Sequence, residues 1–185
     1  MNTGEVLIDL LDDNWRRLNR AFNDLDTACL YWQPDPGGNS IGVTIWHMGR
    51  LFDHFFHTQA LGKAVEEQCW FQNNWARRTG YDPRGLGRDG WGTLNGYTQE
   101  EVRAMPGFSQ EELLGYLEQV CTTVKNYLGT TAEAELFIAG AGFAGRYSRY
   151  QCIQMALLDN IRHLGEIFSL KAMWERRHHE PTLQN

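Results

Sequence analysis

Three residues that lie far apart in the sequence, His47, Asp159 and His163, have side chains that could bind one metal ion. Asp159 and His163 are four residues apart, so on a helix they project from one face and converge on one point. His47 ends an uncharged, mostly apolar segment that begins at Ile41. Two imidazoles and a carboxylate are a ligand set for a divalent metal, with positions left open for water or a substrate. We therefore predict a metal site at these three residues.

The same residues also allow a purely structural interpretation. On the predicted last helix, Asp159 and His163 lie in the middle of the stripe that should face the core. Burying an unpaired carboxylate costs several kcal/mol, so Asp159 must be paired or must bind a metal. An Asp–His hydrogen bond that joins two helices satisfies this requirement as well as a metal does, and spacing alone does not separate the two alternatives.

The remaining histidines have different expected roles. His54 follows His47 by seven residues and shares its helix face. It is the candidate catalytic residue, as a proton acceptor, and it could instead be a further ligand, a group that supports the ligands or a residue at the rim. His57 and the pair His178-His179 are predicted to lie at the surface without a function. Asp53 is assigned a structural role, in which it pairs with an arginine.

Apolar residues recur at helical spacing in four segments, which predicts an all-α fold organised as a four-helix bundle. Bundles of this kind place metal sites in the core, on facing helices. A capping-box pattern at Ser109–Glu112 marks the start of the third helix. The four helices are expected over residues 3–28, about 40–61, 109–128 and about 148–176.

Residues 63–108 are expected to form a long, irregular, glycine-rich loop between the second and third helices. The tryptophans Trp70, Trp75 and Trp91 either line a substrate pocket or anchor this loop to the bundle. The pattern at Thr98–Glu101 is a second capping box, which predicts a short helical turn inside the loop.

Length and composition restrict the class of protein. A chain of 185 residues is expected to form a single domain over residues 1–185. A formal net charge of −6 disfavours nucleic acid as a partner, because phosphate binding needs a basic surface. The chain has no apolar segment of membrane-spanning length, and its acidic first residues are unlike a signal peptide. We therefore expect a cytoplasmic protein whose four cysteines are buried, reduced thiols.

Several segments resemble the DinB-like superfamily. The segment from Asn39 to His54 resembles the motif of its second helix, and residues 75–80 and 90–94 resemble its loop. Residues 114–120 resemble its third helix, and residues 159–166 its fourth. The resemblance covers nearly the whole chain and implies an up-down-down-up four-helix bundle, with a homodimer expected. It also implies a divalent metal held by one ligand from the second helix and two from the fourth.

That resemblance guides the functional hypotheses. Many members have histidine where this chain has Asp159, whereas others have an acidic residue there, so the metal site is expected to be intact. The expected metal is zinc, with nickel, iron or manganese as alternatives. Characterised relatives include S-transferases that use mycothiol, bacillithiol or related thiols. The leading hypothesis is therefore a metal-dependent thiol S-transferase acting on a small-molecule substrate. The alternatives are a metal-dependent hydrolase and a non-enzymatic module for metal binding or dimerisation.

Overall fold

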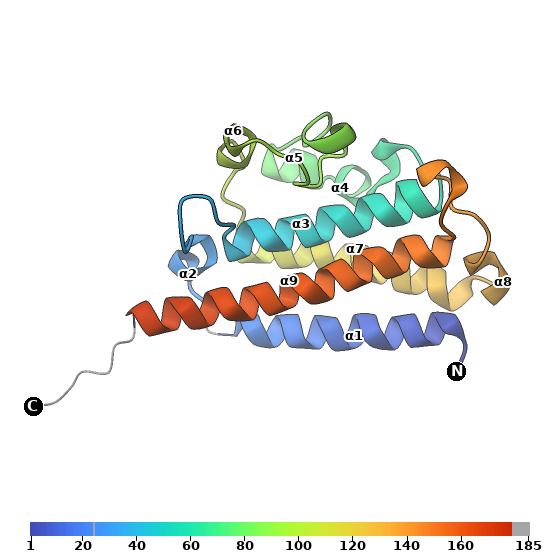
Figure 1. Ribbon diagram of the computed structural model, residues 1–185, viewed down its shortest axis with the longest axis horizontal. Helices are drawn as coiled ribbons and strands as arrows, with labels where there is room; N and C mark the ends of the chain where they lie inside the picture. Colours follow the sequence, from blue (N-terminus) through green and yellow to red (C-terminus); the bar gives the residue numbers. More distant parts are fainter. Residues whose placement is uncertain (24, 179–185) are drawn as a thin grey trace, which may run out of the picture.

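Four long helices form the body of the protein in the computed structural model, which describes residues 1–23 and 25–178. Helices α1 and α3 each pack against both α7 and α9, and Figure 1 shows the four lying side by side. We call these four helices the bundle. Within the described residues there is no β-strand, only one isolated bridge, so the all-α prediction is confirmed. The bundle helices are α1 (Thr3–Phe22), α3 (Ile41–His54), α7 (Gln110–Thr130) and α9 (Arg149–His178).

The directions of the bundle helices explain the long loop. In Figure 1, α3 and α7 run in the same direction, and α1 and α9 run in the opposite direction. The chain that leaves the end of α3 must therefore return along the bundle before α7 can begin. Residues 61–109 make this return over the outer side of α3 (Figure 1), and we call this segment the crossing loop.

Short helical elements divide the connections between the bundle helices. A π-helix, η1 (Phe55–Ala60), continues α3 without a break. The others are α2 (Thr27–Tyr31), η2 (Val65–Glu67), α4 (Cys69–Gln72), α5 (Trp75–Thr79), η3 (Arg88–Gly90), α6 (Gln99–Arg103), α8 (Glu133–Leu136) and η4 (Phe143–Gly145).

Side-chain caps start the helices where the sequence predicted them. The Ser109 hydroxyl accepts a hydrogen bond from the Glu112 amide at 3.1 Å, and the Glu112 carboxylate accepts one from the Ser109 amide at 2.7 Å. Thr98 and Glu101 form the same reciprocal pair at the start of α6. Both capping boxes are therefore confirmed.

The prediction of one helix over residues 3–28 is wrong. Helix α1 ends at Phe22, because Asn23 has an extended ψ of 128°. A separate helix, α2, begins after Asp26, whose carboxylate accepts a hydrogen bond from the Cys29 amide at 2.6 Å. The N-cap at Asp26 competes with continuation of the first helix, and the apolar spacing did not reveal this competition.

Aromatic side chains attach the crossing loop to the bundle. Trp46 of α3 packs edge-on against Trp70 at 6.2 Å between ring centroids and stacks on Phe108 at 6.3 Å. Trp70 and Trp75 are buried, as anchors of the loop are expected to be. All four cysteines are buried and free, as expected. None of the helices in the described residues is both long enough and apolar enough to cross a membrane.

Candidate metal site

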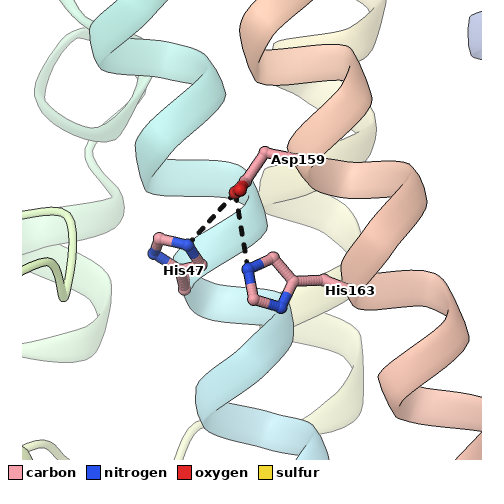
Figure 2. A group of neighbouring side chains, drawn as sticks. All are labelled: His47, Asp159 and His163. Carbon is pink, nitrogen blue, oxygen red and sulfur yellow. Dashed lines mark ion pairs between the residues drawn. The ribbon is translucent and has the colours of Figure 1, made fainter.

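The structure brings His47, Asp159 and His163 together between α3 and α9 (Figure 2). The Nε2 atom of His47 lies 3.3 Å from Oδ2 of Asp159, and the Nε2 atom of His163 lies 3.4 Å from the same oxygen. The two imidazole rings are nearly perpendicular, with centroids 4.8 Å apart. Three potential ligand atoms from two helices therefore converge on one point.

The other nitrogen of each imidazole has an oxygen acceptor. Nδ1 of His47 donates to the main-chain carbonyl of Thr93 in the crossing loop. Nδ1 of His163 lies 2.7 Å from Oε2 of Glu166 and donates to it. With the proton on Nδ1, the lone pair of each Nε2 can face Asp159. Histidines that bind metals in proteins almost always have such a carbonyl or carboxylate partner.

Sequence reasoning missed both of these supporting groups. Glu166 lies three residues after His163, and this spacing on one helix face was a usable signal. Thr93 takes part through its main chain, so the type of its side chain carried no signal.

The Asp159 carboxylate is short of partners. Both imidazole nitrogens lie within ion-pair distance of Oδ2, yet neither has the geometry of a hydrogen bond to it. Oδ2 is buried and has no hydrogen-bond partner among the described residues. Such an atom normally needs a partner, because its hydration is lost without replacement. A bound cation would supply one.

The charges around the three residues favour a cation. Burial raises the pKa of the Asp159 carboxyl, but the neighbouring His163 and His47 imidazoles outweigh burial and lower this pKa well below its usual range. Asp159 and then Glu166 raise the pKa of the His163 imidazole to about 9, against the effect of burial. Without a metal, His163 therefore carries the positive charge that the two carboxylates attract.

The distances fit a small divalent ion. Two atoms that each lie about 2.0–2.2 Å from one ion in tetrahedral geometry are about 3.3–3.6 Å apart. The two nitrogen-to-oxygen distances at Asp159, 3.3 and 3.4 Å, fall in this range. The donor set of two nitrogens and one carboxylate oxygen suits zinc and the related transition metals.

The group faces a pocket of about 410 Å³. The pocket wall includes residues 36–39, residues 94–97 and side chains of α6, and His47, Asp159 and His163 line it as well. A metal bound by these three residues would therefore be reachable by a small molecule. Sites with three protein ligands and an accessible open position are typical of catalytic rather than structural metals.

Comparisons with known proteins identify the family. A family model of the DinB superfamily matches residues 10–167, a range that includes all three candidate ligands. The chain belongs to the DinB superfamily. A solved structure described as a conserved protein from Enterococcus faecalis superposes with a TM-score of 0.76 at 19% sequence identity, over 94% of this chain and 97% of that chain. This likeness shows the fold. No curated protein matches the chain significantly.

The structure does not bring His54 to the three candidate ligands. Seven residues along a helix correspond to about 10 Å, and His54 does not line the pocket. In this DinB-superfamily chain the His54 ring is buried and stacked on Trp91, with centroids 4.7 Å apart. Its two nitrogens contact the amide nitrogens of Gln59 at 2.8 Å and Gln68 at 3.2 Å. Its role as a proton acceptor stays a prediction.

The prediction that His57 lies at the surface is wrong. His57 is buried, and its Nδ1 lies 2.7 Å from Oδ1 of Asp53. The Asp53 carboxylate, four residues earlier, gives the buried imidazole a partner inside the protein. His178, by contrast, is exposed at the end of α9, and His179 lies outside the described residues.

Asp53, His57 and Cys69 form a second group with metal-binding side chains. Here the carboxylate is already satisfied, because Asp53 accepts hydrogen bonds from the amides of Cys69 and Trp70, both at 2.9 Å. Burial raises the pKa of the Cys69 thiol to about 12, so the thiolate that a metal requires is disfavoured. The structural role assigned to Asp53 agrees with this arrangement, which includes an ion pair with Arg50 at 3.4 Å.

The state of His54 gives a pH-dependent prediction. Burial and then the charge of Arg50 lower the pKa of His54 from 6.5 to about 4. The neutral ring is therefore favoured in the folded protein, and its contribution to stability is complete above pH 6.5. It is lost as the pH falls from 6.5 to 4, by up to about 3 kcal/mol. Between pH 7 and pH 4, the free energy of unfolding should fall more for the wild type than for His54→Gln, as measured by denaturant titration. An equal fall in the free energy of unfolding for the two proteins would contradict the lowered pKa of His54.

A second prediction concerns metal content. His163→Ala leaves two of three ligands, so the purified variant should lose its metal while circular dichroism shows an intact helical fold. The matched control is His178→Ala, which removes an exposed histidine from the same helix. Elemental analysis of protein purified without chelators or nickel columns measures the outcome. Equal metal content in all three proteins would show that His163 is not a ligand.

Proposed function

We propose that this protein is a metal-dependent enzyme that transfers a low-molecular-weight thiol to a small electrophile. The observation that carries the proposal is the convergence of His47, Asp159 and His163 at the wall of an open pocket. A structural metal would have a closed set of protein ligands, whereas this group offers three ligands and one accessible side. The proposed ion is zinc, with nickel, iron or manganese as alternatives.

A metal held there would lower the pKa of a thiol bound beside it, so that the thiolate forms at neutral pH. The protein groups have separate tasks in this proposal. The Nε2 atoms of His47 and His163 and the Asp159 carboxylate hold the ion, and Thr93 and Glu166 orient the two imidazoles. The pocket receives the thiol and the electrophile, and the reaction joins the thiol sulfur to the electrophilic carbon as the leaving group departs.

The protein's own cysteines do not supply the nucleophile in this proposal. All four are buried, and none lines the pocket. Burial raises the pKa of Cys29 to about 11 and the pKa values of Cys69 and Cys121 to about 12. Burial also raises the pKa of Cys152, so all four thiols favour their unreactive protonated form. A reactive sulfur must then come from a small molecule.

The pocket also suggests the charge of that molecule. Arg103 lines it, and its guanidinium donates to Gln99 at 3.1 Å. No carboxylate of the described residues lies within ion-pair distance of Arg103, and Asp159 is the one acidic residue in the pocket wall. A divalent ion together with Arg103 would outweigh the charge of Asp159. An anionic thiol is therefore the proposed substrate.

The homodimer also stays a prediction. Exposed apolar side chains on neighbouring faces of α1 and α9, including Leu10, Ile161 and Phe168, favour it.

Cobalt substitution tests the thiol proposal. Protein loaded with Co²⁺ should show no sulfur-to-metal charge-transfer band on its own, because no cysteine is among the three proposed ligands. Addition of 3-mercaptopropionate should produce the band, and His163→Ala should not produce it. A band without added thiol would place a protein cysteine on the metal and contradict the proposal.

If no thiol changes the spectrum but ester or amide substrates are cleaved, the hydrolase replaces the transferase. If neither occurs, the non-enzymatic module is favoured.

The charge of the preferred thiol is a further prediction. Wild-type cobalt protein should bind 3-mercaptopropionate more tightly than cysteamine, which carries the opposite charge. Arg103→Gln should reduce this preference by roughly two- to fivefold, the effect expected for one exposed charge pair. Arg77→Gln removes an arginine that does not line the pocket, and it should leave the preference unchanged. An equal effect of both variants would assign the preference to overall charge rather than to Arg103.

A further inference from the structure

Arg50 is a completely buried arginine on α3, one turn after His47. Its Nη1 atom donates to the Tyr116 hydroxyl at 3.2 Å and pairs with Asp53 at 3.4 Å. Its Nη2 atom donates to Oε1 of Gln68 at 2.9 Å. A buried guanidinium needs this many partners, because it has five donors and cannot lose its charge.

The third nitrogen of the Arg50 guanidinium, Nε, reaches the crossing loop. Its Nε atom donates to the carbonyl oxygen of Gly92 at 3.1 Å. The next carbonyl along the chain, that of Thr93, accepts the hydrogen bond from Nδ1 of His47. Two successive carbonyls of the loop therefore receive hydrogen bonds from two side chains of α3 that lie three residues apart.

The backbone of this loop segment is tightly constrained. Gly92 has φ +61°, and a Cβ atom there would lie 2.4 Å from the carbonyl oxygen of Pro83. Leu94 has φ +75°, which is unfavourable for a residue with a side chain. Strained backbone of this kind persists only where the surrounding contacts hold it, and it is concentrated at functional sites.

We propose that Arg50 is a positioning residue for the metal site, acting on His47 through the Gly92–Thr93 carbonyls. The inference rests on the proposed function only in that His47 is taken to be a ligand. By holding the Gly92 carbonyl, Arg50 keeps the Thr93 carbonyl in front of Nδ1 of His47. That acceptor keeps the proton on Nδ1 and aims Nε2 at Asp159. Without it, the ring can rotate or carry its proton on Nε2, and then it cannot bind a metal there.

Arg50→Lys is the variant that tests this role. Lysine keeps a positive charge for Asp53, but one ammonium group cannot also reach the Gly92 carbonyl with the geometry of Nε. The matched control is Tyr116→Phe, which removes a hydrogen bond from both Arg50 and Asp53 and leaves the Gly92 contact intact. Both variants weaken the same buried network, so a merely structural role predicts similar effects on the metal site.

Two measurements separate the alternatives. Long-range ¹H–¹⁵N NMR on metal-free protein reports exchange of the His47 Nδ1 proton with solvent, and titration with Zn²⁺ against a competing chelator gives the metal affinity. Arg50→Lys should expose the Nδ1 proton to exchange and lower the zinc affinity 10- to 100-fold, the usual effect of removing an orienting contact. Tyr116→Phe should keep wild-type values of both. Equal behaviour of the two variants would overturn the proposal.

A second variant keeps the test decisive if Arg50→Lys does not fold. Gly92→Ala displaces the loop segment from its other side and leaves the Arg50–Asp53 pair in place. The proposal requires the same loss of Nδ1 protection and of zinc affinity, and wild-type values in Gly92→Ala would overturn it. If the wild type itself binds no zinc, the proposed function fails. The exchange of the Nδ1 proton in metal-free protein still decides the role of Arg50.

Discussion

The burial of α3 is the constraint on which the rest of the structure depends. Every residue of this helix except Val43 is buried, although the helix carries charged and polar side chains. His47, Arg50 and Asp53 follow one another at steps of three residues, and we call them the polar row of α3. Each member has lost its water and needs a partner inside the protein. Apolar packing alone therefore does not explain how the bundle and the crossing loop fit together.

The crossing loop supplies most of those partners. Because α3 and α7 run in the same direction, the chain must return along α3 (Figure 1). This return brings main-chain groups of the loop to the polar row. The amides of Cys69 and Trp70 bind Asp53, and the carbonyls of Gly92 and Thr93 bind Arg50 and His47. The end of the row at His47 faces α9, where Asp159 and His163 complete the candidate site. The irregular crossing loop thus supplies hydrogen-bond partners to buried side chains of α3.

The sequence predicted the parts of this arrangement that depend on side-chain spacing. Capping boxes and apolar stripes located the starts of α6 and α7, and the i, i+4 pair on α9 located Asp159 and His163. Features that depend on main-chain geometry could not be predicted from the sequence. The Thr93 carbonyl has no signature in the sequence, and neither does the π-helix that begins at Phe55. Even the break after Phe22 depends on a local competition between a cap and a continuing helix.

The polar row also links the proposed metal to the packing of the loop. The buried Arg50–Asp53 pair gives little net stability, because desolvation offsets most of its attraction. Its contacts instead select one position of the loop, the position in which Thr93 meets His47. A metal that requires His47 in this orientation binds only the protein with the loop in place. The two equilibria are thermodynamically linked. Metal binding must therefore stabilise that loop position by the same free energy by which the loop position strengthens metal binding. The pocket next to the site has residues 94–97 of this loop in its wall. Metal occupancy and the shape of the pocket would therefore be set together.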